Sequence, residues 1–258
     1  LHCDTENLKR NIHKINPDDI IGIGEKYHGA NATFAKILCK KKLNLFEKVL
    51  KKIGVNIVDT EYDYVCSSRR VVKNIEGEKE HHHFYDFDVW TDAMHRIKES
   101  VQDGASLYCE VVGQLPTGSW IQGSYDYGAK ENDYKVIVFR ITQTNNKGQV
   151  FEFSQPQIKR YCEKYELEHA PFYYYGAAKH LYPELSTEEH WHENFLNNLI
   201  RDYNEGDCLY CRNKVPREGV VVVKEGNVYE PYKLKSVAFL ERETKELDSL
   251  TPNLEDEG

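Results

Sequence analysis

The chain has 258 residues, of which 40% are hydrophobic and 29% charged, a composition typical of globular proteins. No run of about eighteen apolar residues occurs, so the sequence excludes a membrane-spanning helix. The formal net charge of −8 argues against a protein that simply coats nucleic acid, although it permits an enzyme with a local basic groove. Seven scattered cysteines predict free thiols in a reducing compartment, and therefore a cytoplasmic location.

The N-terminal half mixes strands with amphipathic helices. Residues 19–27 predict a strand, because isoleucines and glycines lead up to a polar turn. Residues 42–53 and 86–103 carry apolar side chains every three or four positions, which predicts two helices. Between these helices, residues 55–72 favour extended structure, and the charged run at 76–83 predicts a surface loop.

The C-terminal half is richer in strands. Runs of β-branched and aromatic residues predict strands over 106–113, 134–142, 149–153, 219–224 and 232–239. Helices are expected over 155–165 and 187–204. Because the strands are clustered and the helices segregated, the sequence predicts an α+β fold with antiparallel sheets rather than a Rossmann-type alternation.

The segment Glu25–Asn31 has the sequence Glu-Lys-Tyr-His-Gly-Ala-Asn and places Lys26 where an apolar strand meets a turn glycine. A neutral amine is a nucleophile, whereas an ammonium is not, and partial burial favours the neutral form. The alternative interpretation is an ordinary solvated turn lysine, because short motifs often match by chance.

Three further segments place charged side chains in or beside strands. Glu110 interrupts an apolar strand, where an inward-facing carboxylate needs a cation or a hydroxyl partner. Glu218 precedes a glycine and a run of valines, and Lys233 and Lys235 share one strand face, where a phosphate would relieve their repulsion. Each has a plainer alternative: a solvent-facing glutamate, a turn residue, and lysines that protect a sheet edge.

The order of these signals along the chain resembles the motifs of the covalent nucleotidyltransferase superfamily, over about residues 19–240. This superfamily includes ATP-dependent RNA ligases, DNA ligases and mRNA capping enzymes. The Lys26 segment is most similar to the RNA ligase branch related to bacteriophage T4 RNA ligase 2, in which it reads Glu-Lys-x-His-Gly-x-Asn. DNA ligases and capping enzymes usually carry Asp at the position of His28.

The resemblance implies a nucleotidyltransferase (ATP-grasp-like ligase) fold, in which two antiparallel sheets face each other across a nucleotide groove and helices lie outside. It assigns residues 1–240 to an adenylyltransferase domain. Residues 241–258 are expected to be an acidic tail or the start of a further C-terminal region.

The resemblance also implies roles for single residues. Lys26 would attack the α-phosphate of ATP and become lysyl-AMP, and Lys233 and Lys235 would hold that phosphate. Glu110 and Glu218 would organise Mg²⁺ or Mn²⁺. The other expected nucleotide contacts are Glu25 and Phe139 at the adenine, His28 and Asn31 near the phosphate, and Arg70, or its neighbour Arg69, at a phosphate.

These roles predict an ATP-dependent RNA ligase. AMP would move from Lys26 to an RNA 5′-phosphate end, and a 3′-hydroxyl would then displace it, in single strands or in a nicked duplex. One alternative is a DNA ligase or capping-type nucleotidyltransferase with the same lysine chemistry. The other is a catalytically silent nucleic-acid-binding module, against which the intact set of lysines and glutamates argues.

Several other motifs receive no functional role. Cys208 and Cys211 form a Cys-x-x-Cys pair, but two further zinc ligands at suitable spacing are missing. The three histidines at 81–83 are interpreted as part of a charged loop. The aromatic run Phe172–Tyr175 is expected in the core or at a domain seam rather than as a base-stacking platform.

Overall fold

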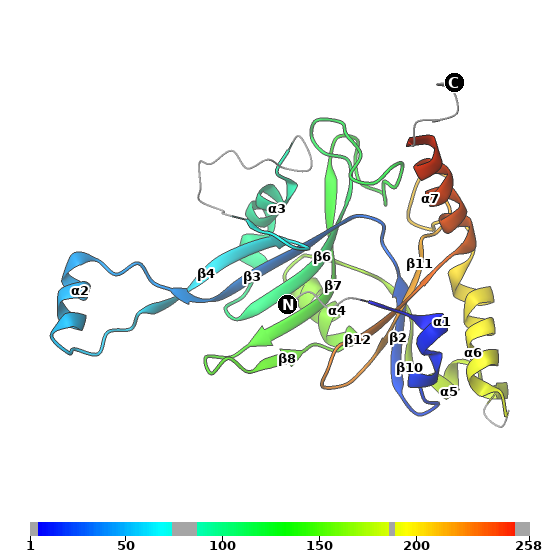
Figure 1. Cartoon of the computed structure of the whole chain (residues 1–258), viewed down its shortest axis with the longest axis horizontal. Helices are drawn as coiled ribbons and strands as arrows, with labels where there is room; N and C mark the ends of the chain where they lie inside the picture. The colour runs from blue at the N-terminus through cyan, green and yellow to red at the C-terminus, as the bar shows by residue number, and fades with distance from the viewer. Residues whose placement is uncertain (1–4, 74–86, 186–188, 251–258) are drawn as a thin grey trace, which may run out of the picture.

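The computed structural model describes residues 5–73, 87–185 and 189–250, and within them the strands form two sheets (Figure 1). Sheet A consists of β1 (Glu6–Asn7), β2 (Ile20–Glu25), β10 (Phe172–Ala177), β11 (Gly219–Lys224) and β12 (Glu230–Lys235). Sheet B consists of β3 (Ala30–Lys40), β4 (Thr60–Ser68), β5 (Val72–Lys73), β6 (Ala105–Gly113), β7 (Tyr134–Thr144), β8 (Val150–Glu152) and β9 (Glu168–His169).

Strand order confirms the predicted class. Sheet A has the order β1-β12-β11-β2-β10, and sheet B has the order β5-β4-β3-β6-β7-β8, with β9 beside β7. Pairing is antiparallel except between β1 and β12 and between β7 and β9, which are short parallel pairs. The α+β fold with antiparallel sheets is therefore confirmed, with these two local exceptions.

Helices cover the outer face of each sheet and bury a separate core there. Outside sheet A lie α1 (Leu8–Asn11), α5 (Ala178–Leu181) and α6 (Trp191–Leu199), and outside sheet B lie α3 (Val89–Ile97) and α4 (Gln155–Lys164). Short 3₁₀ turns occupy Ile12–Lys14, Lys98–Ser100 and Pro183–Leu185, and a π-helical turn at Ile200–Asn204 continues α6. Because the outer faces carry the apolar side chains, the inner faces of both sheets are left for polar chemistry.

Helix α2 (Leu45–Lys52) lies at the tip of the long β3–β4 hairpin, away from the rest of the molecule (Figure 1). It starts later than the predicted residue 42 because Asn44 and Glu47 form a capping box, with each side chain accepting a hydrogen bond from the other's backbone N–H at 2.8 Å. Its apolar face is not buried, and Leu45 and Phe46 are 82% and 71% exposed.

The strand predicted over 232–239 is wrong beyond residue 235. Ser236 caps a helix, α7 (Val237–Leu250), by accepting a hydrogen bond from the Phe239 N–H at 3.1 Å. The boundary expected at residue 240 falls inside this helix. The helix predicted from residue 187 begins at Trp191, and the loop at 76–83 and the end of the chain from residue 251 lie outside the described residues.

No helix in the described part of the chain is long and apolar enough to cross a membrane.

Candidate active site

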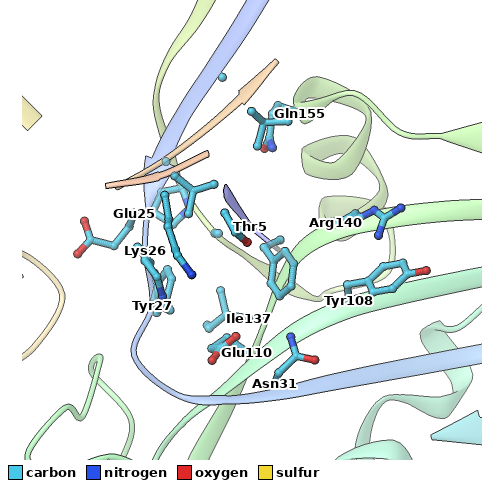
Figure 2. A pocket seen from close by; sticks show the side chains of 18 of the residues that line it. Thr5, Glu25, Lys26, Tyr27, Asn31, Tyr108, Glu110, Ile137, Arg140 and Gln155 are labelled. Carbon is cyan, nitrogen blue, oxygen red and sulfur yellow. The ribbon is translucent and has the colours of Figure 1, made fainter. Parts of the chain in front are cut away.

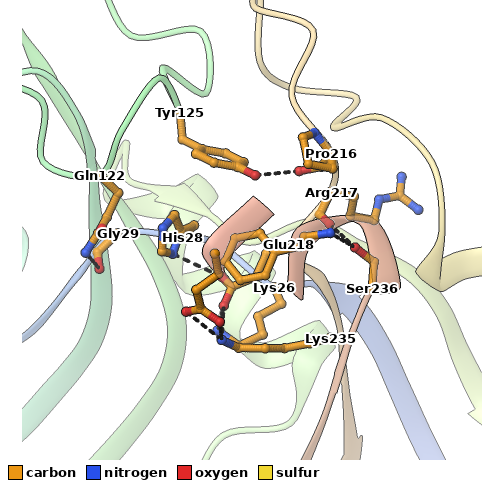
Figure 3. A network of polar contacts seen from close by, with 12 residues as sticks. Lys26, His28, Gly29, Gln122, Tyr125, Pro216, Arg217, Glu218, Lys235 and Ser236 are labelled. Atoms are coloured by element: carbon orange, nitrogen blue, oxygen red, sulfur yellow. Dashed lines mark hydrogen bonds and ion pairs between the residues drawn. The ribbon is translucent and has the colours of Figure 1, made fainter. Parts of the chain in front are cut away.

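A cavity of about 250 Å³ lies between the inner faces of the two sheets (Figure 2). Strands β2, β11 and β12 form one wall, β3, β6 and β7 form the other, and the first residue of α4 contributes to the lining. The predicted site residues that line it are Glu25, Lys26, Asn31, Glu110, Phe139 and Lys233. The predicted residues His28, Glu218 and Lys235 lie beside the cavity, in a polar network around Lys26 (Figure 3).

The sequence left two neighbouring arginines, Arg70 and Arg69, as candidates for the phosphate contact, and the structure places them differently. Arg69 lines the cavity, whereas Arg70 is exposed and does not belong to the described lining. The two arginines form the turn between β4 and β5, which is closed by a hydrogen bond from the Ser68 N–H to the Val71 carbonyl at 2.9 Å, and only Arg69 of the pair lies against the cavity. The charge of Arg69 also lowers the pKa of Glu110, which places it near the carboxylates.

The alternation of β2 decides which side chains reach the cavity. Gly22, Gly24 and Lys26 face the cavity, while Ile21 and Ile23 are fully buried in the core behind the sheet. Lys26 is held at the strand end because its backbone N–H donates to the carbonyl of Gly219 at 3.0 Å. The lysine is therefore positioned by the main chain of its own sheet.

Glu25 points to the other side of β2, away from the cavity (Figure 2). Its carboxylate accepts a hydrogen bond from the Tyr173 hydroxyl and lies 3.1 Å from Nε of Arg217. Burial raises the pKa of Glu25 to about 7, against the opposing effects of Tyr173 and Arg217. Because this side chain is fully buried, only the backbone of Glu25 is left to contact an adenine.

Glu218 is the centre of the network beside Lys26 (Figure 3). Its Oε1 lies 2.8 Å from Nζ of Lys26 and 4.0 Å from Nζ of Lys235, and its side chain is only 3% exposed. Burial raises the pKa of Glu218, while the two lysines lower it. Lys235 is also paired with Glu243 of α7, at 3.0 Å, so helix α7 contributes to the site.

His28 is neutral at pH 7, because burial and the nearby Lys26 ammonium lower its pKa to about 4. Its Nδ1 lies 3.7 Å from Oε2 of Glu218, which is too far for a hydrogen bond. The backbone N–H of His28 donates to the Tyr127 hydroxyl at 2.7 Å. His28 thus packs beside the ion pair and fixes the chain after Lys26.

The chain around Glu218 is held by close backbone packing. Gly219 has φ +140°, and a Cβ there would lie 1.9 Å from the carbonyl oxygen of Leu234, so only glycine fits. The Ser236 hydroxyl donates to the carbonyl of Arg217 at 2.5 Å. These constraints explain the Glu-Gly pair that precedes the valine run.

The opposite wall comes from sheet B. Asn31 pairs with Glu110 across β3 and β6, so the two residues lie side by side. Burial raises the pKa of Glu110 to about 7, although the Lys26 charge lowers it. A β-bulge in β7 leaves Phe139 unpaired, because Tyr108 pairs with Arg140 and Cys109 with Val138. The bulge lets both Phe139 and Arg140 reach the cavity.

Arg140 lines the cavity and contacts aromatic side chains from both sheets. Its guanidinium lies 4.4 Å from the ring centre of Tyr108 and 4.3 Å from that of Tyr229, which lies between β11 and β12. The same guanidinium is paired with Glu152. Cation–π stacking of this kind fixes the side chain as a rigid part of the wall.

The carboxylates fit a divalent cation that retains most of its own waters. Glu218 Oε2 is buried and makes no hydrogen bond within the described residues, and the charge of Glu218 adds to the effect of burial in raising the pKa of Glu110. Mg²⁺ is commonly held by one or two carboxylates plus substrate phosphates. No group of three or more His, Cys, Asp or Glu residues suitable for a metal occurs among the described residues, so a site made wholly of protein ligands is not present there.

The remaining sequence interpretations can be compared with their surroundings. Cys208 and Cys211 are free thiols, and no group of three or more His, Cys, Asp or Glu residues suited to a metal ion occurs in the described part of the chain. Tyr173 and Tyr174 pack against the core of sheet A, which confirms part of the Phe172–Tyr175 interpretation. Tyr173 and Arg217 around Glu25 were not predicted, although Arg217 directly precedes a predicted site residue.

Solved structures similar to this chain include several RNA ligases. They include an RNA ligase of Naegleria gruberi with ATP and Mn (TM-score 0.60, 15% identity, 95% of this chain and 57% of that chain). They also include an apo RNA ligase of the same organism (TM-score 0.58, 16% identity, 94% and 57%) and an archaeal ATP-dependent RNA ligase (TM-score 0.51, 14% identity, 94% and 50%). The fold is therefore the predicted nucleotidyltransferase fold, and this chain spans little more than half the length of these structures.

The sequence profile of the RNA ligase family matches residues 20–235. This match covers most of the chain, and the protein belongs to the RNA ligase family. No curated protein sequence matches it.

Proposed function

We propose that this chain is the catalytic part of an ATP-dependent RNA ligase in which Lys26 carries AMP covalently. The observation that carries the proposal is the position of Lys26 inside the cavity, 2.8 Å from the buried Glu218 and on the same wall as Lys233. A lysine held by a buried carboxylate, among further cations, is the arrangement expected for a nucleophile that attacks a phosphate.

In the first step, the Lys26 amine attacks the α-phosphorus of ATP. A nitrogen–phosphorus bond forms, the bond to the pyrophosphate oxygen breaks so that pyrophosphate leaves with the electron pair, and the amine proton is released to solvent. Displacement at phosphorus depends mainly on in-line positioning and on neutralising charge. Lys233 and Arg69, which line the cavity, and Lys235 at its edge supply that positive charge from side chains already in place.

Glu110 and Glu218 would hold a divalent cation, Mg²⁺ or Mn²⁺, together with phosphate oxygens of the nucleotide. When bound, such a cation supplies additional positive charge to the phosphates. Phe139, freed from the β7 ladder by the bulge, would stack on the adenine, and Asn31 beside Glu110 would contact the phosphate end.

The later steps need RNA. AMP would move from Lys26 to a 5′-phosphate end, and a 3′-hydroxyl would then attack that phosphate and release AMP. His28 in place of Asp favours the RNA ligase branch over DNA ligases and capping enzymes. The family match and the likeness to RNA ligase structures support the same choice of substrate.

The test is transfer of label from [α-³²P]ATP to the protein in the presence of Mg²⁺ or Mn²⁺, followed by a denaturing gel. The wild type should give a labelled, acid-labile band, and Lys26→Ala should give none. Lys147→Ala, in an exposed turn, is the matched control and should label normally. A labelled Lys26→Ala protein, or an unlabelled but folded wild type with both metals, would overturn the proposal. Sealing of a nicked RNA duplex is then compared with sealing of a nicked DNA duplex, which shows which polynucleotide is the substrate.

A further inference from the structure

Gln155, the first residue of α4, lies at the opposite end of the cavity from Asn31 and Glu110 (Figure 2). Its backbone N–H donates to Glu225 Oε1 at 2.9 Å, and Glu225 directly follows β11 of sheet A. The start of this helix is thereby fixed to the other sheet. The side-chain amide lines the cavity and makes no hydrogen bond to another described residue.

Strand β2 runs along the cavity between Lys26 and the side chain of Gln155. Lys26, Gly24 and Gly22 are successive cavity-facing positions, and Gly22 lies about 13 Å along the strand from Lys26. Gln155 packs directly over Gly22, where a Cβ would lie 2.8 Å from Gln155 Cγ. Because Gly22 has no side chain, the side chain of Gln155 can pack against the backbone at this position.

The wall between Lys26 and Gln155 is mostly apolar. The lining here consists of Gly24, Val221 and Val223 on sheet A, with Phe139 on sheet B. Among the charged groups of the lining, Lys233 lies beside Val221 on sheet A, while Arg69, Glu110 and Arg140 belong to the side of sheet B. A nucleotide whose α-phosphate lies between the Lys26 amine and Lys233 can direct its base along the apolar residues of this wall, toward the Gln155 side chain.

We infer that Gln155 determines the choice of base by binding the exocyclic 6-amino group of adenine. This inference rests on the proposed function, because it requires AMP transfer to Lys26 within this cavity. A carboxamide offers an acceptor and two donors, and Oε1 can accept from the 6-amino group while Nε2 donates to an adjacent ring nitrogen. Such paired hydrogen bonds are how glutamine side chains distinguish adenine from other bases.

The experiment compares ATP with purine riboside 5′-triphosphate, which has hydrogen in place of the 6-amino group. The second-order rate constant of protein labelling (kcat/KM) is measured with both nucleotides for wild type, Gln155→Ala and Gln149→Ala. Wild type should prefer ATP by about tenfold, the size expected for one hydrogen bond to a buried group. In Gln155→Ala this preference should fall to about twofold or less, whereas the exposed Gln149→Ala should keep the wild-type value.

A second variant guards against a folding artefact. Gly22→Ala keeps the glutamine but forces it out of place, since the new Cβ would lie within 2.8 Å of its Cγ, and it should also lose the preference for ATP. Full preference for ATP in both variants would overturn the inference while leaving the lysine chemistry intact. Failure of the wild type to label with either nucleotide would instead overturn the proposed function.

Discussion

Replacing Glu218 by Gln removes the charge next to the nucleophile while keeping the shape of the side chain. In the structure its Oε1 lies 2.8 Å from the Lys26 amine and 4.0 Å from that of Lys235, and the side chain is 3% exposed. The variant therefore leaves two ammonium groups facing each other without their shared counter-charge. Lys235 retains its ion pair with Glu243, and Lys26 retains its longer-range interaction with Glu110.

The size of the effect follows from these distances. At 2.8 Å and an effective dielectric constant of about 20, the Lys26–Glu218 attraction is about 6 kcal/mol, part of which offsets the cost of burying both charges. Removing a single electrostatic stabiliser from an active site usually costs about 3 kcal/mol. We therefore expect Glu218→Gln to slow adenylylation of Lys26 about a hundredfold.

The assay is single-turnover labelling of the protein with [α-³²P]ATP at saturating Mg²⁺ or Mn²⁺, with urea unfolding as a check on folding. Glu168→Gln is the matched control, because it removes the charge of an ion pair with Lys135 at 3.0 Å whose glutamate is 56% exposed. That control should change the rate by about twofold or less. A folded Glu218→Gln protein that labels within about threefold of wild type would refute the electrostatic role assigned to this carboxylate.

Three other variants test the site and its support. Arg69→Ala should reduce adenylylation by about tenfold or more, whereas Arg70→Ala should leave it within about twofold, and equal effects would contradict the cavity geometry. Burial raises the pKa of Glu25 from 4.5 to about 7, so between these two values the folded state binds a proton that the unfolded state does not. The unfolding free energy of wild type relative to Glu25→Gln should therefore rise by about 2 kcal/mol as the pH falls from 8 to 5.5. A difference that does not change with pH in urea titrations would exclude this. Gly219→Ala should destabilise the fold by about 3 kcal/mol in the same assay, because its Cβ would strike a backbone oxygen, while Gly148→Ala, which also has a positive φ but open space, should cost about 1 kcal/mol.

The sequence contained enough to predict the strands and the chemistry of one wall. The apolar run before Lys26 and the valine run after Glu218 are local patterns, and the observed strands Ile20–Glu25 and Gly219–Lys224 follow them. The shared face of Lys233 and Lys235 also follows from the period of two along a strand, and the register places them opposite Val221 and Gly219. The same period predicts that Glu25 points away from Lys26, a consequence visible without the structure.

Other features of the site depend on contacts between residues far apart in the sequence, which local sequence patterns do not predict. The β7 bulge arises from how β6 and β7 align, so the sequence could suggest Phe139 but not the arrival of Arg140 beside it. The choice between Arg69 and Arg70 depends on the direction in which the chain leaves β4. Gln155 comes to the cavity only because helix α4 starts against sheet A, through a hydrogen bond between positions seventy residues apart.

The two ends of the cavity should act independently, because each is fixed by different contacts. Lys26 and Glu218 are held within sheet A and its following turn, whereas Gln155 is held by the start of α4 and by Gly22, about 13 Å along β2 from the lysine. Groups this far apart without shared partners usually contribute additively. The double variant Gln155→Ala/Glu218→Gln should therefore show the product of the two single effects on ATP labelling, and it should lose the preference for the 6-amino group as completely as Gln155→Ala does. A double variant no slower than Glu218→Gln alone would mean that the base end and the lysine end are coupled through the bound nucleotide, and would contradict the separation of roles between the two ends.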